Sequence, residues 1–180
     1  MHTIRYKWSI ERWHKLIETG LLEDEPVELL NGEIVRVSPE GVEHRKVNDR
    51  TADYLRELMR GQAKVYEAHP VTLDDSEPKP DIAIVQLPVS LYDDRHPLAE
   101  DIYWLIEVSD KTLQKDLEQK AVTYASQSIQ EYWIIDLKNK KLIVHTHPKG
   151  NNYSQIIEYK KGVISPQAFP NISIELAKIL

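Results

Sequence analysis

Two apolar runs with a helical pattern between them constrain the fold of this chain most. The run IYWLIEVS, residues 102–109, and the run EYWIIDL, residues 131–137, are continuous enough for strands that are buried on both faces. Residues 112–126 between them have the spacing of an amphipathic helix. The sequence therefore predicts a right-handed strand–helix–strand unit at the centre of a sheet.

The rest of the chain supplies helices and strands on both sides of this unit. Helical spacing predicts helices over 9–19 and 43–60, and Asn31-Gly32 predicts a hairpin over 27–37. Further strands are predicted at 63–73 (interrupted at Pro70), 81–87, 141–147, 153–159 and 171–176. This order predicts a single α/β or α+β domain, residues 1–180, built around one mixed sheet.

Composition narrows the class of protein and its location. The chain has 180 residues, no cysteine and a net charge of −6. It has no apolar run near the ~18 residues of a membrane span and no signal peptide, so we expect a cytoplasmic protein without membrane contact.

An acidic chain has no overall field that attracts nucleic acid, so binding to DNA would rest on local lysines and fall sharply with added salt. Lys138, Lys140 and Lys141, and the pair Lys160–Lys161, are candidates for that contact. The competing interpretation is that they are solvated lysines at hairpin turns.

Two acids lie on predicted neighbouring strands. Asp81 opens the strand after Pro80, and Glu107 lies near the end of the apolar run 102–109. A buried carboxylate needs a partner, and two carboxylates that approach each other repel unless a cation lies between them. Oxygen ligands without cysteine suit Mg²⁺ or Mn²⁺.

The predicted helix after Glu107 has a polar row on one face. Asp116, Lys120 and Tyr124 are spaced four residues apart, so they share that face, and a lysine close to metal-bound carboxylates can stabilise charge on a phosphate. The alternative is an ordinary surface ion pair between Asp116 and Lys120, with Tyr124 packed against the sheet and Glu107 facing solvent.

These motifs resemble a known family. Pro80-Asp81 followed by a strand with Glu107 is similar to the PD-(D/E)XK nuclease signature, and EVSDKTLQKDLEQKAVTYASQSIQEYWIIDL resembles the Uma-type family of restriction-endonuclease-like proteins, once a domain of unknown function. The resemblance covers roughly residues 10–176. One position departs from the signature, because Ser109 stands where the motif lysine is expected, and Lys120 is the replacement that the Uma-type pattern implies.

The resemblance implies a restriction-endonuclease-like mixed central sheet flanked by helices, with an N-terminal helix and β-hairpin extension. It implies an endonuclease that depends on Mg²⁺ or Mn²⁺ and forms a homodimer. Its substrate would be nucleic acid, with DNA expected before RNA. Catalytic residues would be Asp81, Glu107 and Lys120, and the metal would be held by the two acids and the backbone carbonyl of Val108. Accessory residues would be Glu28, His44, Asp116 and Tyr124.

Two other kinds of function compete with the enzyme. One is a non-catalytic binding or regulatory module that keeps the nuclease fold, which the acidic charge and Ser109 favour. The other is a homo-oligomeric structural protein whose exposed strand edges pair across a two-fold axis. The accessory residues also have simpler interpretations. The position of Glu28 fits an acid at the edge of a hairpin equally well, and His44 fits a polar residue without a function near the start of a helix.

Overall fold

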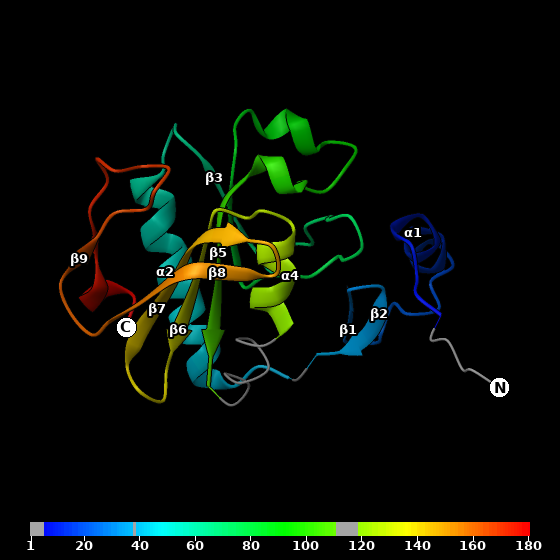
Figure 1. Ribbon diagram of the computed structural model, residues 1–180, viewed down its shortest axis with the longest axis horizontal. Coiled ribbons are helices and arrows are strands. Elements are labelled where there is room, and N and C mark those ends of the chain that lie inside the picture. The colour runs from blue at the N-terminus through cyan, green and yellow to red at the C-terminus, as the bar shows by residue number, and fades with distance from the viewer. Residues whose placement is uncertain (1–5, 38, 111–118) are drawn as a thin grey trace.

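A six-stranded mixed sheet forms the centre of the computed structural model, which describes residues 6–37, 39–110 and 119–180 (Figure 1). The strands are arranged in the order β3-β4-β5-β6-β7-β8. They comprise β3 Lys64–Glu67, β4 Ile82–Val85, β5 Ile102–Ser109, β6 Glu131–Asp136, β7 Lys141–Lys149 and β8 Asn152–Tyr159. Strands β5 and β6 are parallel, and every other neighbouring pair in this sheet is antiparallel.

The remaining elements surround this sheet. Short two-stranded sheets are made by β1 with β2 and by β9 with β10. The elements are α1 Ile10–Glu18, β1 Val27–Leu30, β2 Glu33–Arg36, α2 Val42–Leu58, α4 Ala121–Ser126, β9 Val163–Ile164, β10 Ile174–Glu175 and the 3-10 turns η1 Val89–Tyr92, η2 Ala99–Asp101 and η4 Leu176–Lys178. The predicted fold class, a mixed sheet with flanking helices and an N-terminal helix and hairpin, is confirmed.

The strand–helix–strand unit is present where the apolar runs predict it. β5 runs parallel to β6, with Leu105 paired to Tyr132, and α4 lies between them in the chain. The first part of the predicted helix, residues 112–118, lies outside the described residues. Parallel neighbours require a crossover connection, so the connection over 110–130 is what allows two adjacent central strands to end at the same edge.

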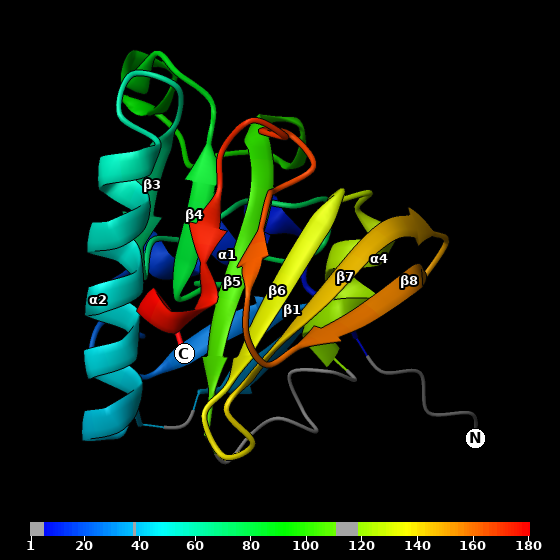
Figure 2. The same ribbon diagram turned by 90° about the vertical axis from the view of Figure 1, so that its left-hand side faces the viewer.

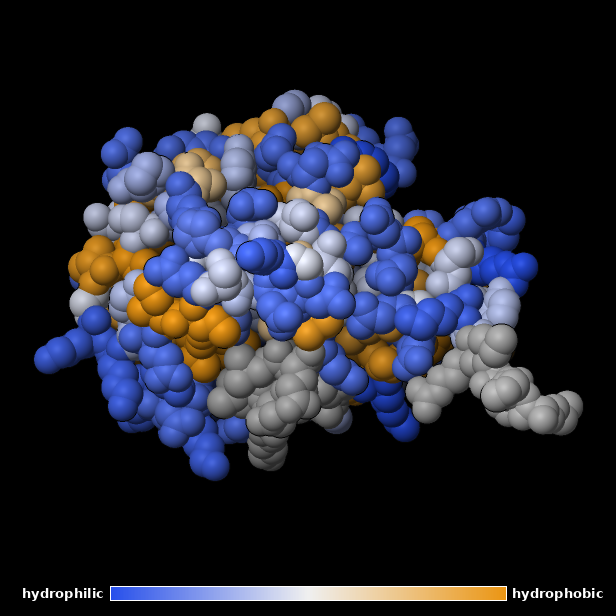
Figure 3. Space-filling view, in the orientation of Figure 1, coloured by the Kyte–Doolittle hydropathy of each residue, from blue (hydrophilic) through white to orange (hydrophobic). Residues whose placement is uncertain are grey.

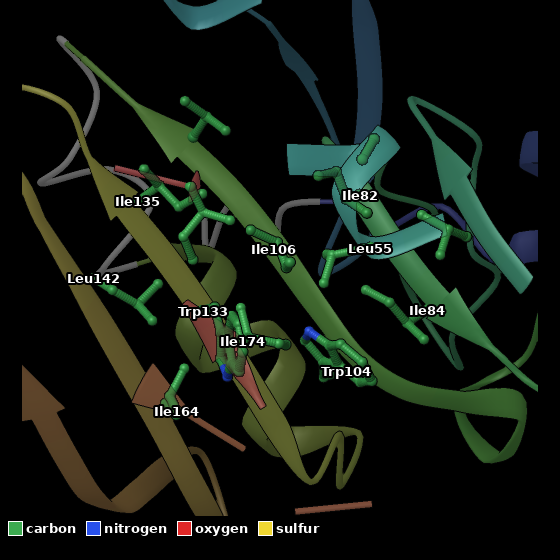
Figure 4. Packing of buried hydrophobic residues seen from close by; sticks show 14 of the residues in the cluster. Leu55, Ile82, Ile84, Trp104, Ile106, Trp133, Ile135, Leu142, Ile164 and Ile174 are labelled. Atoms are coloured by element: carbon green, nitrogen blue, oxygen red, sulfur yellow. The ribbon is translucent and has the colours of Figure 1, made fainter. Parts of the chain in front are cut away.

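Strands β5 and β6 are buried on both faces, with helices on either side of this part of the sheet, which explains why the two strands are apolar (Figure 2). Helix α2 covers one face, where Leu55 packs with Trp104, Ile106 and Trp133 (Figure 4). Helix α4 covers the other face. Its buried residues there pack with Leu105 and Ile134. Because side chains alternate along a strand, the face that receives Leu105 also receives Glu107.

The N-terminal helix and hairpin lie at one end of the molecule, away from the C-terminus (Figure 1). One buried carboxylate holds the helix to the body of the protein. Glu77 accepts hydrogen bonds from Trp13 Nε1 at 2.9 Å and from Thr72 Oγ1 at 2.7 Å, and it pairs with His14 Nε2 at 2.6 Å. The neighbouring Ser76 Oγ accepts from the backbone of Asn31 at 2.8 Å. The loop before Asp81 therefore fixes the position of the hairpin.

Two predicted strands are shorter in the structure. The predicted strand 63–73 is regular only over β3, because Ala68 has a left-handed φ of 47° and ends the extended run before Pro70. The predicted strand 171–176 is reduced to the two residues of β10. The polar loop 91–101 is tied down, because its buried Asp101 pairs with Arg95 and accepts from the backbone of Leu98.

His145 is buried on β7, at 2% exposure. Its ring packs against Tyr132 at 5.4 Å and Tyr153 at 5.6 Å between centroids. Burial lowers the pKa of His145 to about 4, against the opposing effect of a backbone hydrogen bond at Tyr132. The folded protein therefore holds a neutral imidazole that the unfolded chain protonates near pH 6.5.

This burial predicts a pH-dependent stability. Above pH 6.5 His145 is neutral in both the folded and the unfolded state, so its burial does not change the stability with pH. As the pH drops from 6.5 to about 4, the unfolded state takes up the proton first, and the free energy of unfolding falls by about 3 kcal/mol in total. Denaturant titrations over this range should show the loss in the wild type and a much smaller loss in His145→Phe, which keeps the ring packing. The exposed His147→Asn serves as the control and should follow the wild type. Parallel curves for wild type and His145→Phe would contradict the prediction.

None of the helices in the described part of the chain is long and apolar enough to cross a bilayer. The face shown in Figure 3 is mostly hydrophilic, with several separate hydrophobic patches.

Candidate active site

A cleft of about 830 Å³ opens between the β1–β2 hairpin and the ends of β4 and β5. The hairpin contributes Glu28 to its lining, and the sheet contributes Asp81, Glu107 and Val108. Lys120 reaches it from the residue before α4. The cleft thus joins side chains from four separate parts of the sequence.

The two acids of the predicted site lie on the same side of the sheet. Strands β4 and β5 are antiparallel, with Ile82 opposite Ile106, so Asp81 and Glu107 are the next pair along this register. Directly opposed residues project to the same face. Both carboxylates are buried, with 9% exposure for Asp81 and 4% for Glu107, and both line the cleft.

Asp81 is held by a backbone group and a histidine. Its Oδ2 accepts a hydrogen bond from the backbone N–H of Val108 at 2.6 Å, and His44 Nε2 lies 3.0 Å from the same oxygen. Burial lowers the pKa of His44, but the hydrogen bond and charge of Asp81, with the charge of Glu40, outweigh it and leave the pKa above that of free imidazole. The first turns of α2 therefore place a basic side chain against the metal-binding candidate.

Glu107 is held by two side chains from the helix that follows its strand. Lys120 Nζ donates to Glu107 Oε1 at 2.7 Å, and Tyr124 OH donates to the same oxygen at 3.0 Å. The two donors are four residues apart and so lie one turn from each other on one face. The contact between Lys120 and Glu107 that the sequence predicts is present, and Lys120 does not project into solvent as in the surface ion-pair alternative.

Lys120 stays charged in this environment. Its Nζ also lies 3.8 Å from Glu28 Oε2. Burial lowers the pKa of Lys120, yet the charges of Glu107, Glu28 and Asp81 overcome that effect and raise the pKa well above its usual range. A permanently charged ammonium cannot accept a proton from water, so Lys120 is suited to electrostatic stabilisation and orientation.

Glu28 brings the N-terminal hairpin into the site. It is 3% exposed on β1, and its Oε1 accepts from the backbone N–H of Lys79 at 3.1 Å. Glu28 is thus a hairpin acid, but one whose side chain is buried at the cleft. Two buried carboxylates, Glu28 and Glu107, flank one lysine, which lowers the cost of burying them but leaves more negative than positive charge.

Three side chains at the cleft have the spacing of a metal site. Ligand atoms of Glu40, His44 and Asp81 all lie within 4.8 Å of one another. The sequence analysis identified His44 and Asp81 but missed Glu40. Glu40 precedes Gly41, the N-cap of α2, and its Oε2 lies 3.7 Å from Nδ1 of His44. An acid just before the start of the helix that carries His44 was the available signal.

The remaining predicted site residues fall into three groups. Val108 lines the cleft and donates its backbone N–H to Asp81, and the role of its carbonyl as a metal ligand stays a prediction. Asp116 lies outside the described residues. Ser109, at the position of the expected motif lysine, is buried at the end of β5, and Lys120 supplies the ammonium beside Glu107.

A mixed sheet that carries two buried acids on adjacent strands, at the start of β4 and near the end of β5, with a lysine against one of them, is typical of a restriction-endonuclease-like domain. The chain belongs to the Uma2 family, since the family model described as "Putative restriction endonuclease" matches residues 11–177. The predicted family resemblance is thereby confirmed.

A solved structure has the same fold. It is described as a putative nuclease belonging to DUF820 from Anabaena variabilis ATCC 29413, and it superposes with a TM-score of 0.67 at 14% sequence identity. The match covers 85% of this chain and 88% of the other. No curated protein matches the chain.

Proposed function

We propose that this cleft hydrolyses phosphodiester bonds of nucleic acid with the help of a divalent cation. The observation that carries the proposal is the position of Lys120, whose ammonium lies 2.7 Å from Glu107 in the same cleft that Asp81 lines. Membership of a family described as restriction endonucleases supports the same reaction.

Mg²⁺ or Mn²⁺ is the proposed cofactor, and the donor set fits it. Carboxylate oxygens of Asp81 and Glu107, with the backbone carbonyl of Val108, would hold the ion, and the chain has no cysteine to favour a softer metal. His44 and Glu40 lie beside Asp81 as further donors. A divalent cation there would polarise the phosphate and offset the charge that develops on it.

The protein's own side chains would position the reactants. Lys120 would orient the attacking water and stabilise negative charge on the phosphate, which its fixed positive charge suits. Tyr124 holds the carboxylate of Glu107, and His44 holds that of Asp81. These contacts restrict the rotamers of both acids before substrate arrives, which limits the reorganisation needed during reaction.

The proposal also includes DNA as the substrate and a homodimer as the active form.

The homodimer is proposed from the edge of the sheet. Strand β8 lies at this edge and exposes Ile156, at 57%, and Ile157, at 37%. An edge strand with exposed apolar side chains is a ready surface for pairing with a second copy. Sedimentation velocity on the wild type and Ile156→Lys would test this, and equal masses for the two proteins would contradict it.

The reaction is tested by incubating the purified chain with labelled DNA and RNA in Mg²⁺, Mn²⁺ or EDTA. We expect strand cleavage that requires the metal and is absent in EDTA. Lys15→Ala, which breaks an exposed pair with Glu11 at 2.6 Å on α1 and does not line the cleft, is the control and should cleave as the wild type does. If the folded wild type cleaves no substrate in either metal, the proposal of an enzyme is wrong and a non-catalytic module takes its place.

A further inference from the structure

The groups proposed for catalysis lie at the bottom of the cleft and not on its rim. Glu28 is 3% exposed, Glu107 is 4% exposed, and the Lys120 side chain is 12% exposed. A scissile phosphate must therefore descend between the cleft walls to reach them. How much nucleic acid can follow it depends on the space between those walls.

The cleft is small compared with a nucleic-acid duplex. Its volume of about 830 Å³ lies within the range of roughly 300–1,000 Å³ that holds drug-sized ligands. A few nucleotides of one strand fit such a space. A double helix, whose major groove alone is ~12 Å wide, would have to remain outside.

The walls of the cleft are apolar in large part. Pro26, Val27, Val37 and Pro39 line it from the hairpin side, and Ala68 lines it from the end of β3. A duplex stacks its bases internally and presents phosphates to a protein surface, whereas an unpaired strand also exposes base faces and sugars that can pack on apolar groups. The wall chemistry therefore suits an unpaired strand.

The charge of the cleft also disfavours a duplex. Among the described residues, the lining includes two lysines, Lys79 and Lys120, and Lys120 is already paired with Glu107. The lining carboxylates outnumber them and comprise Glu28, Glu40, Asp81, Glu107 and Asp110. A duplex brings one negative charge per ~1.7 Å of axis, twice the density of a single strand, so it is repelled more strongly.

We infer that the substrate entering this cleft is single-stranded nucleic acid, either a free strand or an unpaired end. The inference rests on the proposed function for its chemistry but makes a separate statement about binding. The hairpin that forms one wall is held in place by two hydrogen bonds, from Glu77 N–H to Leu29 O at 2.7 Å and from Asn31 N–H to Ser76 Oγ at 2.8 Å. Duplex DNA is the alternative that the experiment must exclude.

The test compares one labelled oligonucleotide alone with the same strand annealed to its complement. Binding is measured by fluorescence anisotropy with Lys120→Gln in Mg²⁺ and, as a second arrangement, with the wild type in EDTA. We expect the single strand to bind about tenfold more tightly or better, and the wild type in Mg²⁺ to cleave it preferentially. Equal or tighter binding of the duplex would overturn the inference.

Two variants of the hairpin sharpen the test. Val37→Glu places a charge on the cleft wall and should weaken single-strand binding about tenfold. Ile34→Glu adds the same charge on β2, at an exposed position opposite Leu29 that does not line the cleft, and should bind as the parent does. Equal effects of the two variants would contradict the placement of the strand in this cleft.

The outcomes separate the two proposals. If the single strand binds preferentially but the wild type cleaves nothing, the inferred ligand is supported and the proposed nuclease reaction is contradicted. If the wild type cleaves duplex preferentially, the nuclease reaction is supported and the inferred ligand is contradicted. Binding of neither ligand would remove both.

Discussion

Replacing Lys120 with alanine is expected to reduce metal-dependent cleavage by at least about 100-fold. The variant loses the positive charge that lies 2.7 Å from Glu107 and 3.8 Å from Glu28, so nothing offsets charge on the phosphate at that position. The measurement is the initial rate of cleavage of a labelled strand in Mg²⁺.

The stability of this variant must be followed at the same time. Removing one partner of a buried ion pair costs about 3–5 kcal/mol, because the carboxylates of Glu107 and Glu28 stay buried without it. Lys120→Gln keeps a donor for Glu107 and should be more stable than the alanine variant but equally inactive. Full activity in a folded Lys120 variant would leave this residue as a structural ion pair.

Replacing Asp81 with asparagine is expected to lower the affinity for Mn²⁺ by at least about 100-fold and to abolish cleavage. Asparagine has the same size and can still accept the hydrogen bond from Val108 N–H, so the strand pairing should persist. What it lacks is the negative charge that an ion and His44 both need. Titration calorimetry with Mn²⁺ measures the change.

Asp136→Asn is the matched control for this substitution. Asp136 is also buried at the end of a central strand, where it accepts hydrogen bonds from the backbone and side chain of Asn139 at 3.0 and 2.7 Å. It does not line the cleft, so its variant should lose some stability and keep the wild-type affinity for Mn²⁺. Equal loss of metal affinity in both variants would show that the Asp81 effect is indirect.

The centre of the fold was predictable because its signals are local and strong. The apolar runs of β5 and β6 bury their side chains on both sides of the strand, which requires a sheet that is covered on both faces. The spacing of Lys120 and Tyr124, four residues apart, places both side chains on one helical face. The spacing alone left open an ordinary surface ion pair of Lys120 with Asp116. The resemblance to the Uma-type family is what predicted the contact between Lys120 and Glu107.

The parts that the sequence did not predict depend on contacts between distant segments. Glu77 is one acid in a polar loop, and nothing local shows that Trp13 and Thr72 donate to it. The burial of Glu28 likewise depends on the hairpin folding back over the sheet. His145 alternates along β7 as a solvated residue would, and its burial follows from the packing of Tyr132 and Tyr153 around it.

The position of Mn²⁺ in a crystal tests the central claim most directly. The account predicts an anomalous difference peak in the cleft, at about 2 Å from carboxylate oxygens of both Asp81 and Glu107. Lys120 should remain beside Glu107 in that structure, as it is here at 2.7 Å. A fully soaked crystal with no peak in the cleft, or with the ion held away from both carboxylates, would contradict the account.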